Sequence, residues 1–475
     1  MKHIVFAVAL LAVYPMGRWL RGQPRHQITA LVILGLLPFL SPPDINFVSY
    51  EDYRGDSRGF EVTLLDLLVL ALYVALPPAK RSSPFRLARY AYLVAAVISL
   101  IPAMSPLFGA FAIWKLLRMY VLLEVVTRAC SDVRAPQALL RGMMLGVVAQ
   151  FGMVLYQRYV LHVHQTPGWF GHQNAMAMSV NLVLPVALAL LLSGRRGWLH
   201  VAAAATAPFT VVLSISRGAM GALVLLTGVS FTVAMARGRP LRTVALVAVA
   251  MVLAAGVLLK AGDTIIARFE SARRGEAEVA TPQGEADTRA AFNKAAVLML
   301  KDHPMGIGIN QFSLVFVQGG YADRVAPGWS DSASFGAPDH AYGAVGHNIY
   351  WLTLAELGLQ GFVPFLVMVL QPMFEGFRYG WRARTGVRGD LLLGFGTGLL
   401  ALNSQGLLEW TWRQTEVGYL FWMVAGIVAA LSRQLRAAGT DSHRRPATHP
   451  GWPGVRPADP DEGAAGEFER AVLIS

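Results

Sequence analysis

Residues 346–370 read GHNIYWLTLAELGLQGFVPFLVMVL and join the longest polar stretch of the chain to an apolar segment. The polar stretch runs from Lys260 to Gly346, and the apolar segment that begins near residue 348 is long enough to cross a bilayer of about 30 Å as a helix. Similar apolar stretches begin near residues 4, 27, 62, 88, 107, 138, 174, 199, 219, 241, 348, 389 and 417. We therefore predict an all-α protein, a polytopic transmembrane bundle of about 12–13 helices with one large polar loop that contains short helices.

The composition indicates the same class. Apolar residues make up 55% of the 475 residues and charged residues 15%, and the mean hydropathy is +0.46, which is outside the range of a soluble globular domain. The single cysteine, Cys130, excludes a disulfide framework. The expected organisation is transmembrane helices over residues 1–259, the large loop over 260–346, transmembrane helices over 347–436 and a disordered cytoplasmic tail over 437–475.

The distribution of Lys and Arg predicts the orientation, because these residues accumulate in cytoplasmic loops. If the spans alternate, all basic loops fall on one side: residues 18–25, 80–89, 128–141, 195–196, 237–242, 378–388 and the tail from residue 433. The opposite, outer side then receives residues 41–61, 162–172, 217, 260–346 and 409–416, and also the N-terminus. The net charge of +12 is therefore a topology signal, and no nucleic-acid partner is predicted.

Two arginines on the expected outer side are candidate anion ligands. Arg217 lies in Ser-Ile-Ser-Arg-Gly, where one span ends and the next begins. Arg289 precedes an expected helix over residues 290–301, with Asp287 or Thr288 as its N-cap, so the arginine lies in the first turn and opposes the helix dipole. A stabilising role explains that position poorly. The alternatives are a snorkelling arginine at 217 and, at 289, a salt bridge to an acid of the loop.

Histidines and intramembrane charges supply further candidates. His347 begins the span after the polar loop, where an imidazole can accept a proton near neutral pH, although a capping histidine gives the same pattern. Lys115, Arg118 and Glu124 fall within one span, where charges are costly; they form either a structural ion pair among themselves or a cationic patch near a lipid phosphate. No metal site is predicted, because no Asp or Glu completes a ligand set with the histidines at 162, 164 and 172.

An ordered set of motifs resembles the O-antigen ligase and Wzy-type polymerase superfamily over about residues 140–370. The motifs are Gly171-His172-Gln173-Asn174-Ala175, Ser216-Arg217-Gly218, Arg289 followed by His303-Pro304-Met305-Gly306-Ile307-Gly308, and His347-Asn348-Ile349-Tyr350 with Ala355-Glu356-Leu357-Gly358-Leu359-Gln360-Gly361. The resemblance implies a GT-C-like glycosyltransferase of the bacterial inner membrane. Such an enzyme takes a glycan from an undecaprenyl diphosphate carrier at the periplasmic face, inverts the anomeric centre and needs no metal, nucleotide sugar or other cofactor.

The resemblance also implies roles for particular residues. Arg217 and Arg289 would engage the diphosphate, and His347 would be needed for transfer. This fits the chemistry, because guanidinium groups bind phosphate oxygens bidentately and a base assists a weak hydroxyl nucleophile. The expected substrate-binding residues are His172, Asn174, Arg118, Lys115, His340 and Asn348, with His340 as a spare base.

The acceptor decides between two members of this superfamily. In the ligase pattern the His-Asn pair is followed after nine residues by Gly and, two residues later, by paired threonines. Here Gly358 is kept but the chain continues Leu359-Gln360-Gly361-Phe362, which favours a polymerase of O-antigen, capsule or exopolysaccharide repeat units over a ligase that uses lipid A core. A flippase and a chain-length regulator are possible partners in either case. A transporter or flippase is the competing class, but the sequence lacks the duplicated halves typical of transporters.

Overall fold

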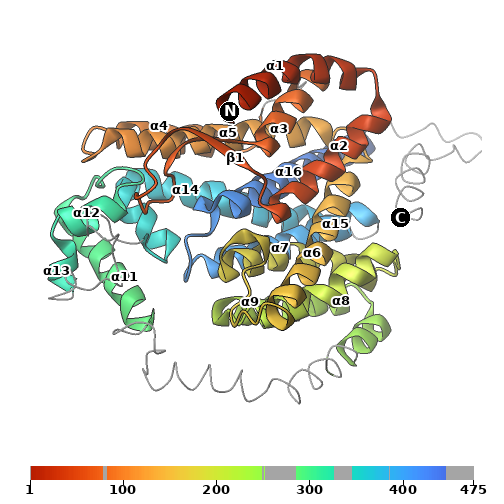
Figure 1. Cartoon of the computed structure of the whole chain (residues 1–475). Helices are drawn as coiled ribbons and strands as arrows, with labels where there is room; N and C mark the ends of the chain where they lie inside the picture. The colour runs from red at the N-terminus through yellow and green to blue at the C-terminus, as the bar shows by residue number, and fades with distance from the viewer. Residues whose placement is uncertain are drawn as a thin grey trace, which may run out of the picture.

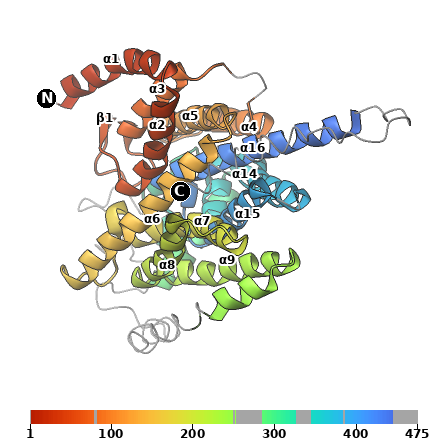
Figure 2. The same cartoon turned by 90° about the vertical axis from the view of Figure 1, so that its right-hand side faces the viewer.

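The computed structural model describes residues 2–78, 83–248, 251, 285–325, 345–383 and 386–444. Over these residues the protein is a bundle of helices with one small hairpin (Figures 1 and 2). The helices before the polar loop are α1 (Lys2–Arg21), α2 (Pro24–Leu36), α3 (Leu64–Ala75), α4 (Arg86–Ile98), α5 (Pro106–Ala129), α6 (Ala135–Tyr159), α7 (Gln173–Leu192), α8 (Trp198–Leu213) and α9 (Arg217–Ala236). Those that follow are α11 (Glu285–Asp302), α12 (Phe312–Gln318), α13 (Tyr321–Val325), α14 (Ile349–Arg382), α15 (Val387–Gln405) and α16 (Thr415–Arg444). Short 3₁₀ turns are η1 (Leu37–Leu40), η2 (Gly168–Phe170) and η4 (Thr411–Arg413).

Six of the described helices are long and apolar enough to cross a membrane: α5, α6, α7, α9, α14 and residues 415–437 of α16. Residues 24–40, α3 and α8 are shorter apolar helices. The protein is therefore a multi-pass membrane protein, and the predicted all-α polytopic bundle is confirmed. The count of about 12–13 spans and the GT-C-like arrangement stay predictions. Helix α16 continues to Arg444, so it covers the first residues of the predicted tail.

Helices α7 and α16 are the most enclosed spans, with 89% of the most apolar stretch of each buried. Close helix contacts explain part of this burial. At Gly398 of α15 a β-carbon would lie 2.2 Å from the carbonyl oxygen of Leu182 in α7, so only glycine allows the two backbones to approach this closely. In Figure 1 the short helices α11, α12 and α13 lie together at one side of this bundle, beside α14. The predicted short helices of the polar loop are thus present.

The hairpin was not predicted. Strands β1 (Asp44–Ser49) and β2 (Gly59–Thr63) form an antiparallel pair, and both lie between α2 and α3 in the sequence. Two strands alone are marginally stable in water, so the hairpin depends on its contacts with helices. Tyr53, between the strands, is fully buried and stacks on Phe108 of α5, with 3.9 Å between the ring centroids. The hairpin is thereby fixed at the end of the bundle where α5 begins.

Candidate functional site

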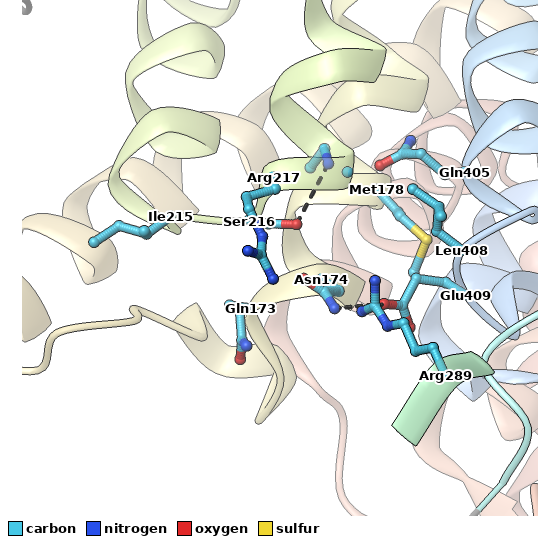
Figure 3. A pocket seen from close by; sticks show the side chains of 12 residues that line it. Gln173, Asn174, Met178, Ile215, Ser216, Arg217, Arg289, Gln405, Leu408 and Glu409 are labelled. Carbon is cyan, nitrogen blue, oxygen red and sulfur yellow. Dashed lines mark hydrogen bonds and ion pairs between the residues drawn. The ribbon is translucent and has the colours of Figure 1, made fainter. Parts of the chain in front are cut away.

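Two arginines from different helices line one pocket (Figure 3). Arg217 comes from the start of α9, which precedes the polar loop in sequence, and Arg289 comes from α11 within that loop. The pocket is lined by Gln173, Asn174, Met178, Ile215, Ser216, Arg217, Gly218, Ala219, Arg289, Gln405, Leu408 and Glu409. The fold therefore brings together two of the three residues expected to act in transfer, and the lining combines cationic, amide and apolar groups.

Helix α9 begins at Arg217 and is held at that end by two side chains. The N-cap hydroxyl of Ser216 accepts a hydrogen bond from the amide of Ala219 at 3.4 Å, and the amide of Asn181 in α7 donates to the Ala219 carbonyl oxygen at 2.9 Å. The first turn of a helix has amides without intrahelical partners and the positive end of the helix dipole. Arg217 adds a full positive charge to that end, so this edge of the pocket favours an anion.

Arg289 is positioned by α11 and paired with Glu409. The helix begins at Glu285, a turn earlier than expected, so the prediction of an N-cap at Asp287 or Thr288 was wrong and Arg289 lies beyond the first turn. The sequence permits the earlier start, because glutamate and alanine at 285 and 286 have high intrinsic helix propensity. The guanidinium Nη2 of Arg289 lies 2.9 Å from Oε1 of Glu409, so its partner belongs to the loop after α15 rather than to the polar loop.

Glu409 joins three elements of the site. Its Oε1 accepts from the amide of Asn174 at 2.6 Å as well as from Arg289, and its Oε2 lies 3.4 Å from Nδ1 of His347. The side chain of Glu409 is 6% exposed, whereas those of Arg289 and His347 are 25% and 28% exposed. One buried carboxylate therefore connects an arginine of the pocket with the histidine beside it. Sequence reasoning placed Glu409 on the outer side but assigned it no role.

His347 is held next to this carboxylate by its neighbour Asn348. Asn348 is the N-cap of α14, with its side-chain oxygen accepting from the amides of Tyr350 and Trp351 at 3.0 and 3.2 Å. Its amide nitrogen donates to the carbonyl oxygen of Leu407 at 2.9 Å, which ties the start of α14 to the loop that carries Glu409. The structure thus gives Asn348 an anchoring contact, and its predicted role in substrate binding stays a prediction.

A family model described as O-antigen ligase matches residues 201–366. Over these residues the chain resembles the O-antigen ligase family. The matched residues include Arg217, Arg289 and His347, whereas Glu409 lies beyond them. No curated protein matches the sequence. The similarity supports an O-antigen ligase- or polymerase-type membrane enzyme, and the two arginines and the histidine lie within the matched residues.

The remaining motifs position the site. Helix α11 ends at Asp302 and the chain turns at residues 303–308. The amides of Ile307 and Gly308 then donate to the carbonyl oxygens of residues 355 and 356 at 3.0 and 2.9 Å. This pairing requires Gly358, whose φ of +61° interrupts α14. The glycine-containing motifs therefore fasten α11 to the first part of α14, which keeps Arg289 near His347.

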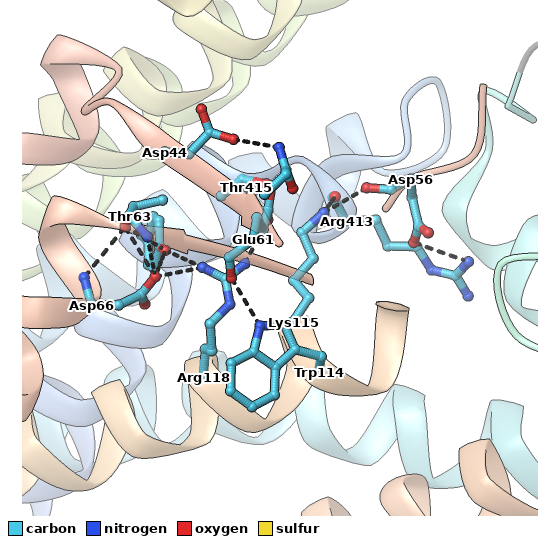
Figure 4. Close-up of polar contacts among 12 residues, drawn as sticks. Asp44, Asp56, Glu61, Thr63, Asp66, Trp114, Lys115, Arg118, Arg413 and Thr415 are labelled. Carbon is cyan, nitrogen blue, oxygen red and sulfur yellow. Dashed lines mark hydrogen bonds and ion pairs between the residues drawn. The ribbon is translucent and has the colours of Figure 1, made fainter. Parts of the chain in front are cut away.

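Lys115 and Arg118 lie in a buried network under the hairpin and do not line the pocket (Figure 4). Lys115 Nζ donates to the carbonyl oxygens of Asp56 and Arg413 at 2.6 and 2.7 Å. Arg118 pairs with Glu61 and Asp66, both at 2.5 Å, and donates to the hydroxyl of Tyr419 at 2.8 Å. Both residues therefore have protein partners that fix the hairpin to α5.

Of the two alternatives left open for these residues, the ion pair with Glu124 does not form. Glu124 pairs instead with Arg128 at 2.9 Å, four residues further along α5. Residues four apart in a helix lie on the same face, whereas Arg118, six residues before Glu124, does not face it. The prediction that Lys115 and Arg118 bind substrate is not tested by these contacts.

A second buried ion cluster escaped the sequence reasoning. Arg413 of η4 pairs with Glu356 of α14 and lies 3.4 Å from Oδ2 of Asp56 in the hairpin, and all three side chains are less than 10% exposed. Burial opposes the charge of Arg413, but the two carboxylates outweigh this effect and raise its pKa above the ordinary value. The cluster connects hairpin, α14 and the segment before α16. Glu356 lies within an expected span, where a charge is costly, and this was the signal in the sequence that could have identified the cluster.

The last candidates are histidines. His172 is the N-cap of α7, and its Nδ1 accepts from the amide of Asn174 at 3.3 Å. It therefore orients the helix end that presents Asn174 to the pocket. His340 lies outside the residues that the structure describes. Within the described part of the chain, no three His, Cys, Asp or Glu side chains lie where they could hold a metal ion together.

Proposed function

We propose that the protein is a glycosyltransferase that polymerises repeat units of a surface polysaccharide at the periplasmic face of the bacterial inner membrane. Its donor would be a glycan linked to undecaprenyl diphosphate, and its acceptor a second lipid-linked glycan. The observation that carries the proposal is the pocket lined by Arg217 and Arg289, with His347 joined to Arg289 through Glu409. The similarity to the O-antigen ligase family supports the same reaction class.

In this mechanism the acceptor hydroxyl attacks the anomeric carbon from the face opposite the diphosphate. The bond between the anomeric carbon and the phosphate oxygen breaks, and the configuration at that carbon inverts. The hydroxyl proton passes to His347, and the negative charge that develops on the leaving diphosphate is stabilised by Arg217 and Arg289. The chain's own groups thus supply both electrostatic stabilisation and a base, and no metal or nucleotide is required.

The charge pattern supports the periplasmic location of the pocket. The ends of α9 and α14 opposite the pocket carry a basic cluster, in which Arg237 and Arg239 pair with Asp390 at 3.2 and 2.9 Å. Basic residues of this kind accumulate on the cytoplasmic side. The pocket then faces the compartment where lipid-linked glycans are displayed, with the isoprenoid tail of the donor in the bilayer.

The sequence after Gly358 supports polymerisation over ligation. Gln360 occupies the position of the first of the paired threonines in the ligase pattern, and its amide donates to the carbonyl oxygen of Met305 at 2.6 Å. The alternative function is transfer of a finished glycan to lipid A core, which the description of the matching family model favours. Transport of lipid without transfer is the less favoured class.

The test is the glycan profile of cells that lack this protein and carry wild type, Arg217→Ala, Arg289→Ala or His347→Ala. We expect each variant to abolish transfer while the protein remains in the membrane, since one electrostatic contact of this kind is worth about 100–1,000-fold in rate. Exposed residues of the same side provide the matched controls Arg54→Ala and His164→Ala, which should retain activity.

The profile also separates the candidate functions. Loss of long chains, with single repeat units still attached to an acceptor, supports a polymerase. Long chains that remain on the lipid carrier, with bare lipid A core, support a ligase. Normal long chains in any two of the three variants would overturn the proposed mechanism.

A further inference from the structure

We propose that Glu409 is a positioning residue for His347, an inference that rests on the proposed function. The carboxylate Oε2 lies 3.4 Å from Nδ1 of the imidazole. An ionised carboxylate has only acceptor sites, so the contact requires the hydrogen of His347 on Nδ1. The other ring nitrogen, Nε2, then carries the lone pair and is the atom that takes the proton of the acceptor hydroxyl.

The surroundings of Glu409 hold its carboxylate in one orientation. A buried carboxylate without partners is costly, and its side chain is only 6% exposed. Oε1 is occupied by Asn174 at 2.6 Å and by the guanidinium of Arg289 at 2.9 Å, which leaves Oε2 as the oxygen nearest to His347. The two oxygens are thus assigned to different partners, and the carboxylate has one orientation.

This arrangement gives Glu409 a function during the reaction as well as before it. When His347 takes the proton it becomes an imidazolium, and the adjacent carboxylate stabilises that charge. The same carboxylate is tied to Arg289, which receives the diphosphate in the proposed mechanism. Glu409 therefore couples the group that accepts the proton with a group that stabilises the leaving group.

Glu409 could act on the reaction through Arg289 alone or through His347. Both routes would lower kcat, because Arg289 and His347 both act in the chemical step of the proposed mechanism. If Glu409 served only to hold Arg289, its loss would add nothing in an Arg289→Ala background. If it orients His347, its loss would lower the residual rate of Arg289→Ala further, because the base would present the wrong nitrogen or the wrong angle.

The experiment uses the full-length protein purified into lipid nanodiscs, with lipid-linked donor and acceptor. Kinetics are measured for wild type, Glu409→Gln, Glu409→Asp, His347→Ala, Arg217→Ala, Arg289→Ala and the double variant Arg289→Ala/Glu409→Gln. We expect Glu409→Gln to lower kcat by part of the roughly 100–10,000-fold that a positioned general base contributes. Glu409→Asp keeps the charge and should recover part of kcat.

The outcomes are distinguishable. Inactive His347→Ala and Arg217→Ala with a normal kcat for Glu409→Gln would overturn this inference alone and leave the proposed function standing. A Glu409→Gln change that lowers kcat in the wild type but not in the Arg289→Ala background would overturn it in favour of a role restricted to Arg289. Normal activity in both His347→Ala and Arg217→Ala would overturn the proposed function itself. Elution as a monodisperse peak from a sizing column checks that each variant has folded.

Discussion

Replacing Arg413 by methionine should destabilise the protein strongly. Methionine fills much of the space of the arginine stem but removes the charge from between Glu356 and Asp56, whose side chains are 2% and 4% exposed. Removing one partner of a buried ion pair typically costs about 3–5 kcal/mol. With an unfolding entropy of about 2 cal/mol/K per residue over 475 residues, this corresponds to a Tm lower by about 3–5 °C.

A second substitution tests the cause. The amide of Phe312 donates to Oε1 of Glu356 at 3.0 Å, and Glu356→Gln can keep this hydrogen bond while it removes the buried charge. In the Arg413→Met background we therefore expect Glu356→Gln to restore stability, by about 1–3 kcal/mol relative to Arg413→Met alone. In the wild-type background the same change should be destabilising, because it leaves Arg413 with one carboxylate fewer.

The assay is thermal denaturation of the detergent-solubilised protein. The quantity measured is the fraction of protein that remains monodisperse after heating to each temperature. Arg54→Met is the matched control, because Arg54 is an exposed arginine of the same hairpin and should leave the Tm nearly unchanged. The reasoning is refuted if Arg413→Met melts with the control, or if Glu356→Gln destabilises both backgrounds equally. Either result would mean that the buried charges do not depend on one another.

Two further predictions concern the same end of the bundle. Gly358→Ala should destabilise the protein by about 1–3 kcal/mol, because an L residue at φ +61° is strained and its β-carbon would lie 2.6 Å from the carbonyl oxygen of Pro304. The measurement is the Tm together with transfer activity, and an unchanged Tm would contradict the claim that position 358 requires glycine. Lys115→Met should lower the Tm and leave the donor KM of the folded protein unchanged, because Lys115 contacts backbone oxygens of the protein. A raised donor KM at an unchanged Tm would instead favour the substrate-binding role predicted from the sequence.

The sequence predicted the helical elements well because hydropathy is a local property. Most of the predicted starts of apolar segments lie within a few residues of a helix start, as at α5 and α7. The hairpin was missed because its strands are five and six residues long and are stabilised by distant partners such as Phe108 and Asn310. Local patterns do not contain such contacts.

The sequence indicated three residues of the candidate site but not its carboxylate. Arg217, Arg289 and His347 were identified through their expected places near helix ends and through motif order, and their roles stay predictions. Glu409 was not, because its partners lie 62, 120 and 235 residues away in the chain and a lone acid in a short loop has no periodic signal. Likewise, Lys115 was identified as a costly intramembrane charge, but the residue that satisfies it comes from the hairpin.

The place of Glu409 in the chain also determines when the pocket is completed during biosynthesis. Glu409 follows both Arg289 and His347, so a ribosome releases α11 and the start of α14 before their shared carboxylate exists. Until α15 and the loop after it are inserted, Arg289 and His347 lack this shared carboxylate. In the proposed mechanism, transfer activity would therefore be acquired late in membrane insertion. A truncated chain that ends before residue 409 would have α9, α11 and the start of α14 without a complete site.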